Sequence, residues 1–256
     1  MRIGIAKPEW GFRGGFEFVL DRIVDQLSAA GHDVVWLTID AAAAGQPPHA
    51  AFGMAIPDDV WANAVEYFRY LTMVERFGAL DASGTDVLLC TQPGSWAVEH
   101  PRKLALFYHH LRVFYDLAET YVDAGFSDPV FHDPCTAEVR SLDAPLIDGV
   151  RHFLTPSGEV DARLATFNGI GADRRSPFLA GFAFRDGRGV AARPSDGTGH
   201  VLSVSRHEWP KRTELVVATA HHLRAAGVEV EVKVVGGGGR LEHAKAVDAR
   251  LGRLSG

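Results

Sequence analysis

Two cations lie close together in the last third of the chain, where a strand pattern gives way to a helix pattern. Val201 to Val204 is the continuous apolar run expected of a buried parallel strand, and apolar residues return at helical spacing from Leu215 onward. Arg206 follows the strand and Lys211 stands five residues later. Ligands bind open α/β sheets at the carboxyl ends of strands, and the N–H groups and dipole of a helix start favour anions there. A guanidinium fork and a mobile ammonium at this place predict a diphosphate site.

The plainer interpretation of these two residues is a pair of solvated charges. A helix dipole disfavours cations at the helix N-terminus, so their presence there argues for a bound anion.

A glycine run is predicted at the same edge of the sheet. Gly236 and Gly237 open a run of four glycines after the apolar strand Val228 to Val235. The run is either a plain loop or a backbone contact for the same ligand.

Two histidines follow another apolar strand, Leu104 to Tyr108, and adjacent side chains at a strand end diverge. We therefore expect one of His109 and His110 to face the crevice and the other to face the flank of the sheet, where a histidine is often only a polar core residue. Arg112 and Tyr115 follow, either on the ligand side or as an ion-pair partner and a packed aromatic ring. Diverging histidines without a carboxylate or cysteine at ligand spacing argue against a metal site.

A pair of glycines, Gly14 and Gly15, separates the first predicted strand from the first predicted helix. Such a pair can serve a βα turn that needs positive φ. It can also let a phosphate or a sugar approach the backbone, because no side chain intervenes.

Strand and helix patterns alternate along the rest of the chain, which predicts an α/β fold with a parallel sheet. Predicted strands are Arg2 to Ala6, Asp33 to Leu37, Val87 to Thr91, Leu104 to Tyr108, His152 to Thr155, Val201 to Val204 and Val228 to Val235. Predicted helices are Phe16 to Ala30, one from Asp58, Cys135 to Leu142, Glu159 to Phe167, Thr213 to Ala226 and Leu241 to Leu251. We expect a Rossmann-like domain over 1–180, a linker over 181–199 rich in Arg, Gly, Pro and Ser, and the start of a second, incomplete Rossmann-like domain over 200–256.

Composition narrows the class of protein. With 256 residues, a formal charge of −6 and a pI near 6.0, the chain has no global attraction for nucleic acid or for an anionic membrane. Cys90 and Cys135 lack metal or redox spacing and are expected to be reduced residues in or near the core. No window reads as a signal peptide or a transmembrane segment. We therefore expect a cytoplasmic protein with no nucleic-acid partner.

Several motifs together resemble the retaining glycosyltransferases of family 4 (glycosyltransferase group 1), which have the GT-B architecture of two facing Rossmann-like domains. The motifs that carry the resemblance are Gly14-Gly15-Phe16-Glu17, Gly31-His32-Asp33-Val34, Tyr108-His109-His110, Thr155-Pro156-Ser157, the spacing of Arg206 and Lys211, and Val234-Val235-Gly236-Gly237-Gly238. The resemblance covers nearly the whole chain.

The resemblance implies transfer of a sugar from a nucleoside-diphosphate sugar to an acceptor, with retention of configuration and without a metal or other cofactor. It assigns His110 as the catalytic group that hydrogen-bonds the transferred sugar. It places the donor diphosphate against Arg206, Lys211, Gly14, Gly15, Gly236 and Gly237. The candidate residues on the acceptor side are His109, Arg112 and Tyr115, and the acceptor itself is a saccharide, a lipid-linked molecule or a small molecule.

The chain also departs from the family. Arg212 stands where many relatives have glycine, and we expect the backbone there to be helical. The segments that hold the base and ribose in the family, with two glutamates separated by seven residues, have no counterpart up to Gly256. From the resemblance we expect one of three cases: a fragment, one half of a split enzyme completed by a second chain, or an inactive remnant.

Two other functions stay open. One is a non-catalytic binding or regulatory role for such a remnant. The other is a dinucleotide-dependent oxidoreductase. This is disfavoured because Gly11-x-x-Gly14-Gly15 is not the G-x-G-x-x-G fingerprint, and Asp33 and Asp40 are poorly placed to bind a ribose.

Overall fold

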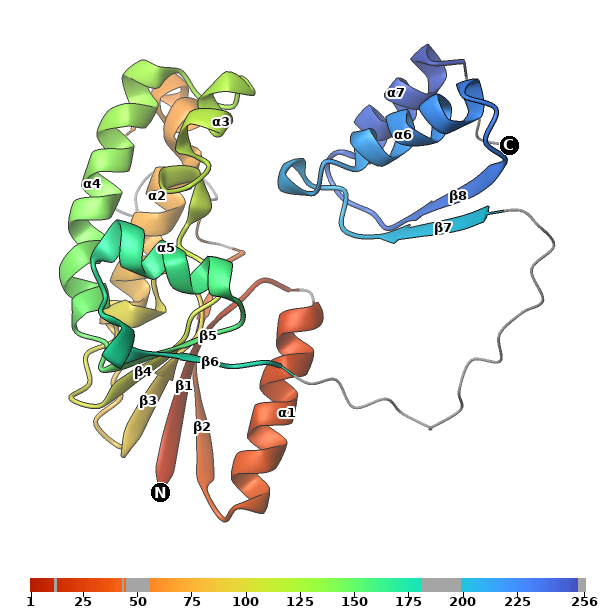
Figure 1. Ribbon diagram of the computed structural model, residues 1–256. Helices are drawn as coiled ribbons and strands as arrows, with labels where there is room; N and C mark the ends of the chain where they lie inside the picture. The colour runs from red at the N-terminus through yellow and green to blue at the C-terminus, as the bar shows by residue number, and fades with distance from the viewer. Residues whose placement is uncertain (12, 43, 45–55, 181–198, 253–256) are drawn as a thin grey trace. The chain divides into compact units, whose positions relative to one another are not determined.

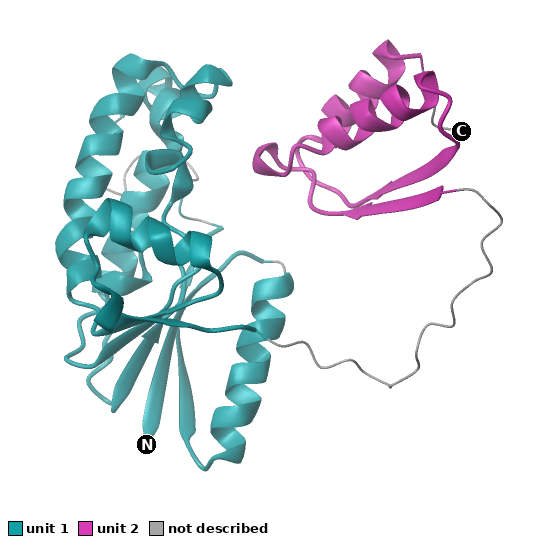
Figure 2. Cartoon of the chain, in the orientation of Figure 1, with its two compact units in different colours: residues 1–184 teal, residues 185–256 magenta. Residues whose placement is uncertain are grey.

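The computed structural model describes residues 1–11, 13–42, 44, 56–180 and 199–252 (Figure 1). The chain divides into two compact units, residues 1–184 and residues 185–256, which we call unit 1 and unit 2 (Figure 2). Of the predicted linker over 181–199, only Gly199 is described, and it begins a strand; the rest lies outside the described residues.

Unit 1 is built on a six-stranded sheet with the order β2-β1-β3-β4-β5-β6, in which every neighbouring pair is parallel. Its strands are β1 (Arg2–Glu9), β2 (Asp33–Asp40), β3 (Val87–Cys90), β4 (Lys103–Leu106), β5 (His152–Thr155) and β6 (Arg175–Pro177). Its helices are α1 (Gly15–Ala29), α2 (Asp58–Gly78), α3 (Ala118–Asp123), α4 (Pro129–Asp148) and α5 (Gly158–Asn168). The predicted α/β fold with a Rossmann-like parallel sheet is confirmed.

Helices cover both faces of this sheet (Figure 1). On one face, Val19 and Leu20 of α1 pack with Ile5 and with neighbours on β3 and β4. On the other face, a larger apolar cluster joins the sheet to α2, α4 and α5 and includes Phe77 and Phe153, neither of which is exposed. Burial on both faces explains why the strands read as continuous apolar runs.

Prolines account for two differences from the predicted elements. β1 continues three residues past Ala6, through Pro8, because β3 pairs with β1 only as far as Ala6 and needs no N–H from Pro8. α4 extends well beyond the predicted Cys135 to Leu142 although it contains Pro134 and Pro145. Packing of its buried face outweighs the local cost of the two prolines.

Unit 2 is a small parallel pair of strands, β7 (Gly199–Val204) and β8 (Val230–Val235), with α6 (Thr213–Ala225) and α7 (Leu241–Arg250) on one face (Figure 1). The half-buried side chains of β8 are valines, whereas its opposite face carries polar and exposed residues. On β7, Leu202 and Val204 are 66% and 68% exposed. Among the described residues of unit 2, Ala244 is the one buried hydrophobic residue. This unit therefore has very little hydrophobic core.

Candidate functional site

Two loops meet at the carboxyl ends of β7 and β8, one over residues 205–212 and one over 236–240. Backbone hydrogen bonds join them. Ser205 N–H donates to the carbonyl of Val235 at 3.1 Å, His207 N–H to that of Gly237 at 2.8 Å, and Arg240 N–H to that of His207 at 2.7 Å. The two loops thus form one scaffold at the edge of the sheet where ligands bind in folds of this kind.

Close approach of the two loops requires glycine at two positions. Gly236 has φ of 144°, and a Cβ there would lie 1.9 Å from the carbonyl oxygen of Ser205. Gly238 has φ of 141°, and its Cβ would lie 2.6 Å from the carbonyl oxygen of His207. Gly237 has no such neighbour within 4 Å. The close approach of the two backbones therefore explains why Gly236 and Gly238 are glycines. The contact between this turn and a diphosphate stays a prediction.

Both predicted cations lie on the first of these loops. Arg206 is exposed directly after β7, and Lys211 is exposed at the end of a short 3₁₀ turn, Trp209–Lys211. The backbone of Lys211 donates to the carbonyl of Glu208 at 2.9 Å, so the turn positions the residue before α6 begins. This placement after a strand agrees with the prediction, and the role of the two residues in binding an anion stays a prediction.

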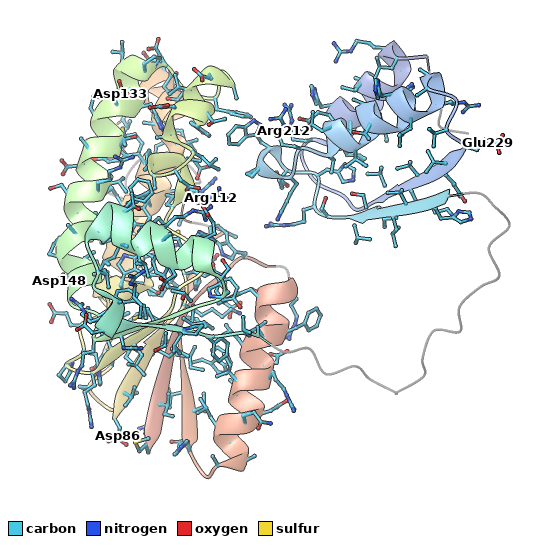
Figure 3. The ribbon with its side chains drawn as sticks, viewed as in Figure 1. Asp86, Arg112, Asp133, Asp148, Arg212 and Glu229 are labelled. Atoms are coloured by element: carbon cyan, nitrogen blue, oxygen red, sulfur yellow. The ribbon has the colours of Figure 1, made fainter. Side chains whose placement is uncertain are left out.

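The expectation of helical backbone at Arg212 is wrong. Arg212 has φ of 48° and ψ of 43°, the left-handed conformation that glycine adopts at least cost, and α6 begins only at Thr213 (Figure 3). The reason is local, because the 3₁₀ turn closes just before it and the chain must change direction to enter the helix. The side chain of Arg212 forms an ion pair with Glu214.

Two buried polar residues beside this scaffold, His207 and Thr213, were not among the predicted site residues. His207 is 3% exposed and neither ring nitrogen has a hydrogen-bond partner among the described residues. It borders a cavity of about 890 Å³ between β8, α6 and α7. Thr213 is 1% exposed and its hydroxyl also lacks a partner among those residues. Buried polar groups without partners are costly and rare, so they mark incomplete packing or an unfilled binding function.

In unit 1, the two adjacent histidines diverge as expected. His110 is fully buried, stacks on Tyr115 with ring centroids 4.0 Å apart, and places Nε2 2.6 Å from Oδ1 of Asn168. Burial lowers the pKa of His110 to about 4, so its ring is neutral near pH 7. His109 is exposed, and its Nδ1 lies 2.6 Å from the carbonyl oxygen of His110. The catalytic assignment of His110 stays a prediction, and its ring is fully buried in this structure.

Tyr115 belongs to a buried hydrogen-bond network centred on a carboxylate that the sequence did not point to. Its hydroxyl donates to Oδ2 of Asp143 at 2.7 Å, while Trp96 Nε1–H donates to Oδ1 at 2.9 Å and Tyr70 donates to the same oxygen. Asp143 is not exposed at all, and burial raises the pKa of its carboxyl group. The network fixes the ring on which His110 stacks.

Arg112 forms a fork-like ion pair with Asp116, in which Nη2 lies 2.6 Å and Nε 3.0 Å from Oδ2. Arg163 approaches the same carboxylate to 3.2 Å. These contacts lower the pKa of Asp116 against the opposing effect of its burial. The geometry shows the ion pair. An acceptor-side role for Arg112 stays a prediction.

The first glycine pair already has a partner within the chain. Gly14 N–H donates to Oε2 of Glu17 at 2.7 Å, which makes a capping interaction at the start of α1. Neither Gly14 nor Gly15 has positive φ, and a Cβ on Gly15 would meet nothing within 4 Å. The turn therefore does not demand this glycine pair for its conformation. A donor contact there stays a prediction.

No group of three or more His, Cys, Asp or Glu side chains in the described part of the chain could hold a metal ion. No helix in that part is both long enough and apolar enough to cross a membrane.

Comparison with known proteins supports the fold. The sequence matches no family profile, and no curated protein is detectably similar to it. The structure resembles that of the lipopolysaccharide outer core galactosyltransferase WaaB in its apo form, with a TM-score of 0.56 and 14% identity over 98% of this chain and 65% of WaaB. The chain therefore spans slightly less than two thirds of that relative.

Two further structures are more distant. The glycosyltransferase of kitacinnamycin has a TM-score of 0.45 and 14% identity over 91% of this chain and 65% of its own. SnogD from Streptomyces nogalater has a TM-score of 0.40 and 16% identity over 100% of this chain and 69% of its own. The chain thus has an α/β fold similar to that of the GT-B glycosyltransferase WaaB, to which it is 14% identical.

Proposed function

We propose that this chain carries parts of a sugar transferase that uses a nucleoside-diphosphate sugar. The observation that carries the proposal is the scaffold of unit 2, in which Arg206 and Lys211 lie on a loop joined by backbone hydrogen bonds to a glycine turn. The fold match to the galactosyltransferase WaaB supports the same reaction class. Retention of configuration and membership of family 4 rest on the motif spacing alone.

The chemistry follows from where charge develops. As the glycosidic bond breaks, negative charge builds on the diphosphate that leaves. Cations held by a fixed loop bind that charge more strongly in the transition state than in the ground state, which lowers the barrier. Arg206 and Lys211 supply this charge without a metal ion. The acceptor, a saccharide, a lipid-linked molecule or a small molecule, belongs to unit 1 in this proposal.

A second chain contributes to the donor side in this proposal. The motifs of the family that hold the base and ribose have no match among these residues. Leu202 and Val204 on β7 are largely exposed, as expected for strands that need a neighbour.

Calorimetric titration of the full chain with UDP and with GDP tests the diphosphate site. Arg206→Ala and Lys211→Ala should each cost about 1.5–3 kcal/mol of binding free energy, roughly a 10- to 150-fold rise in Kd. Arg224→Ala is the matched control, because Arg224 is an exposed cation at the other end of α6. Unchanged affinity in both test variants would overturn the diphosphate site.

A binding or regulatory role without catalysis is the second candidate, and one observation favours it. Unit 2 has almost no buried apolar residues, so a preorganised donor site depends on added structure. Donor hydrolysis and transfer assays on the purified chain separate the two functions. Multiple turnovers show an enzyme, whereas nucleotide binding without turnover supports the binding role.

A further inference from the structure

A second cavity lies wholly within unit 1, between α1 and the edge strand β2. Its volume is about 650 Å³, within the range of small-molecule sites, which is about 300–1,000 Å³. Lys7 and Glu9 of β1, Trp36 and Thr38 of β2, and Glu17 of α1 line it. Lys7, Glu9 and Thr38 stand near the carboxyl ends of β1 and β2, the side of a parallel sheet where ligands bind, and Trp36 lies at the middle of β2.

Trp36 is the unusual residue of this cavity. It pairs in register with Ile5, which is fully buried under α1, yet Trp36 as a residue is 43% exposed. β2 is the edge strand, so α1 packs beside Trp36 without covering it. A large aromatic surface left in contact with water at the rim of a cavity is a platform on which a ligand ring can stack.

Charged groups beside the indole determine which charge and polarity a ligand of this cavity can have. The Lys7 ammonium lies 5.8 Å from the indole centroid and bonds both carboxylate oxygens of Glu9, at 3.0 and 3.1 Å. Arg13 forms an ion pair with Asp21 at the rim. Since both cations are matched by carboxylates and Glu17 adds a third carboxylate, the lining has a net negative charge and disfavours a phosphate or another anion. The same ionic groups disfavour a purely hydrocarbon ligand.

We propose that this cavity is a saccharide subsite for a neutral sugar ring. The apolar C–H face of the ring lies on Trp36, and its hydroxyl groups exchange hydrogen bonds with the Lys7 ammonium and the Glu9 carboxylate, which together offer donors and acceptors. Thr38 adds a hydroxyl at the same end of the cavity. The choice of a sugar among neutral polar rings rests on the proposed function; the stacking site and its charge preference do not.

Direct binding to the full chain tests this subsite without any turnover. Saturation-transfer NMR and calorimetry are run with methyl glucoside, methyl galactoside and lactose as neutral probes, glucosamine as a cation and glucuronate as an anion. We expect a neutral probe to bind more tightly than glucuronate. Trp36→Ala should weaken its binding about tenfold, whereas Trp36→Phe should keep most of the affinity because the aromatic face remains.

Phe18→Ala is the matched control, because Phe18 is a 58% exposed aromatic residue of α1 that does not line the cavity. Circular dichroism and thermal melting show whether each variant is folded. Binding unaffected by Trp36→Ala, tighter binding of glucuronate or of glucosamine than of the neutral probes, or no binding of any probe overturns the proposal. UDP titration is run on the same samples. Nucleotide binding without saccharide binding removes this subsite alone, and saccharide binding without nucleotide binding removes the proposed transferase while leaving the subsite.

Discussion

Asp143→Ala should strongly destabilise unit 1. The carboxylate is not exposed and accepts hydrogen bonds from Tyr70, Trp96 and Tyr115, so its removal leaves three donors without their acceptor in the core. Each buried donor left unsatisfied costs about 1–3 kcal/mol, so the loss of three bonds to one acceptor costs at least about 3 kcal/mol. We therefore expect the free energy of unfolding to fall by about 3–5 kcal/mol, which lowers the Tm of a domain of this size by roughly 6–20 °C.

Asp143→Asn should cost less, about 1–3 kcal/mol, because its amide oxygen can still accept from Tyr70 and Trp96. Only the bond with Tyr115 must reverse its direction. Asp148→Asn is the control on the same helix, since its ion pair with Arg174 is at the surface and contributes about 0–1 kcal/mol.

The pH dependence of the Asn variant gives a second readout. Burial raises the pKa of Asp143, so the folded state holds this proton more tightly than the unfolded chain. The stabilising contribution is complete below the ordinary pKa of an aspartate, about 3.9, and is lost as pH rises through the folded pKa. The stability of the natural protein relative to Asp143→Asn should therefore fall as pH rises above about 4.

Urea unfolding of the full chain, followed by near-ultraviolet circular dichroism of the aromatic rings, measures these differences. A loss below about 1 kcal/mol in Asp143→Ala would refute the reasoning, because it would mean that the three donors find other partners. A rise in relative stability with pH would refute the inferred direction of the pKa shift.

Three other predictions concern the candidate sites. His110→Ala should lower turnover more than donor affinity, because a bond to the reacting sugar matters most in the transition state. Steady-state kinetics measure both quantities, with His109→Ala as the control. A larger loss of turnover in His109→Ala than in His110→Ala would mean that the roles of the two histidines are reversed. Gly236→Ala should weaken nucleotide binding by about tenfold or more in calorimetry, since its Cβ would lie 1.9 Å from a backbone oxygen of the facing loop, whereas Gly237→Ala should not. Amide hydrogens of Val230–Val235 should exchange quickly in the purified chain because unit 2 buries so little apolar surface; strong protection in a monomer would contradict this.

Local sequence pattern predicted the sheet of unit 1 well, for a physical reason. Strands buried on both faces are short apolar runs, so His152 to Thr155 was predicted with its observed bounds and Val87 to Thr91 with one residue too many. Where packing outweighs propensity the pattern fails, as in α4, which continues through Pro134 and Pro145 and is longer than predicted. The short strand β6 was missed because its three residues carry no apolar pattern.

For the candidate site, the sequence predicted which residues follow the ends of strands, but not the contacts between residues that are distant in the chain. Arg206 follows β7 as expected, because the end of a strand is visible in the sequence. The left-handed backbone at Arg212 follows a 3₁₀ turn that was not predicted, although the glycine that many relatives have at this position was a signal for it. Asp143 meets Tyr70 across 73 positions in sequence, and the burial of His110 depends on rings from other segments, so neither could be derived from spacing.

The capping interaction at the start of α1 has a consequence for competition between anions. Glu17 is 8% exposed and places its carboxylate on the N–H of Gly14, so the first turn of the helix already holds a negative group supplied by the chain itself. A phosphate that binds the N–H of Gly14 would have to displace the Glu17 carboxylate. Because Glu17 is only three residues away in the same chain, the effective concentration of its carboxylate at this N–H is very high. Both helix starts that were predicted to face a diphosphate therefore carry a carboxylate in their first turn, but the two carboxylates have different partners: Glu17 binds the N–H of Gly14 before α1, whereas Glu214 of α6 forms an ion pair with Arg212.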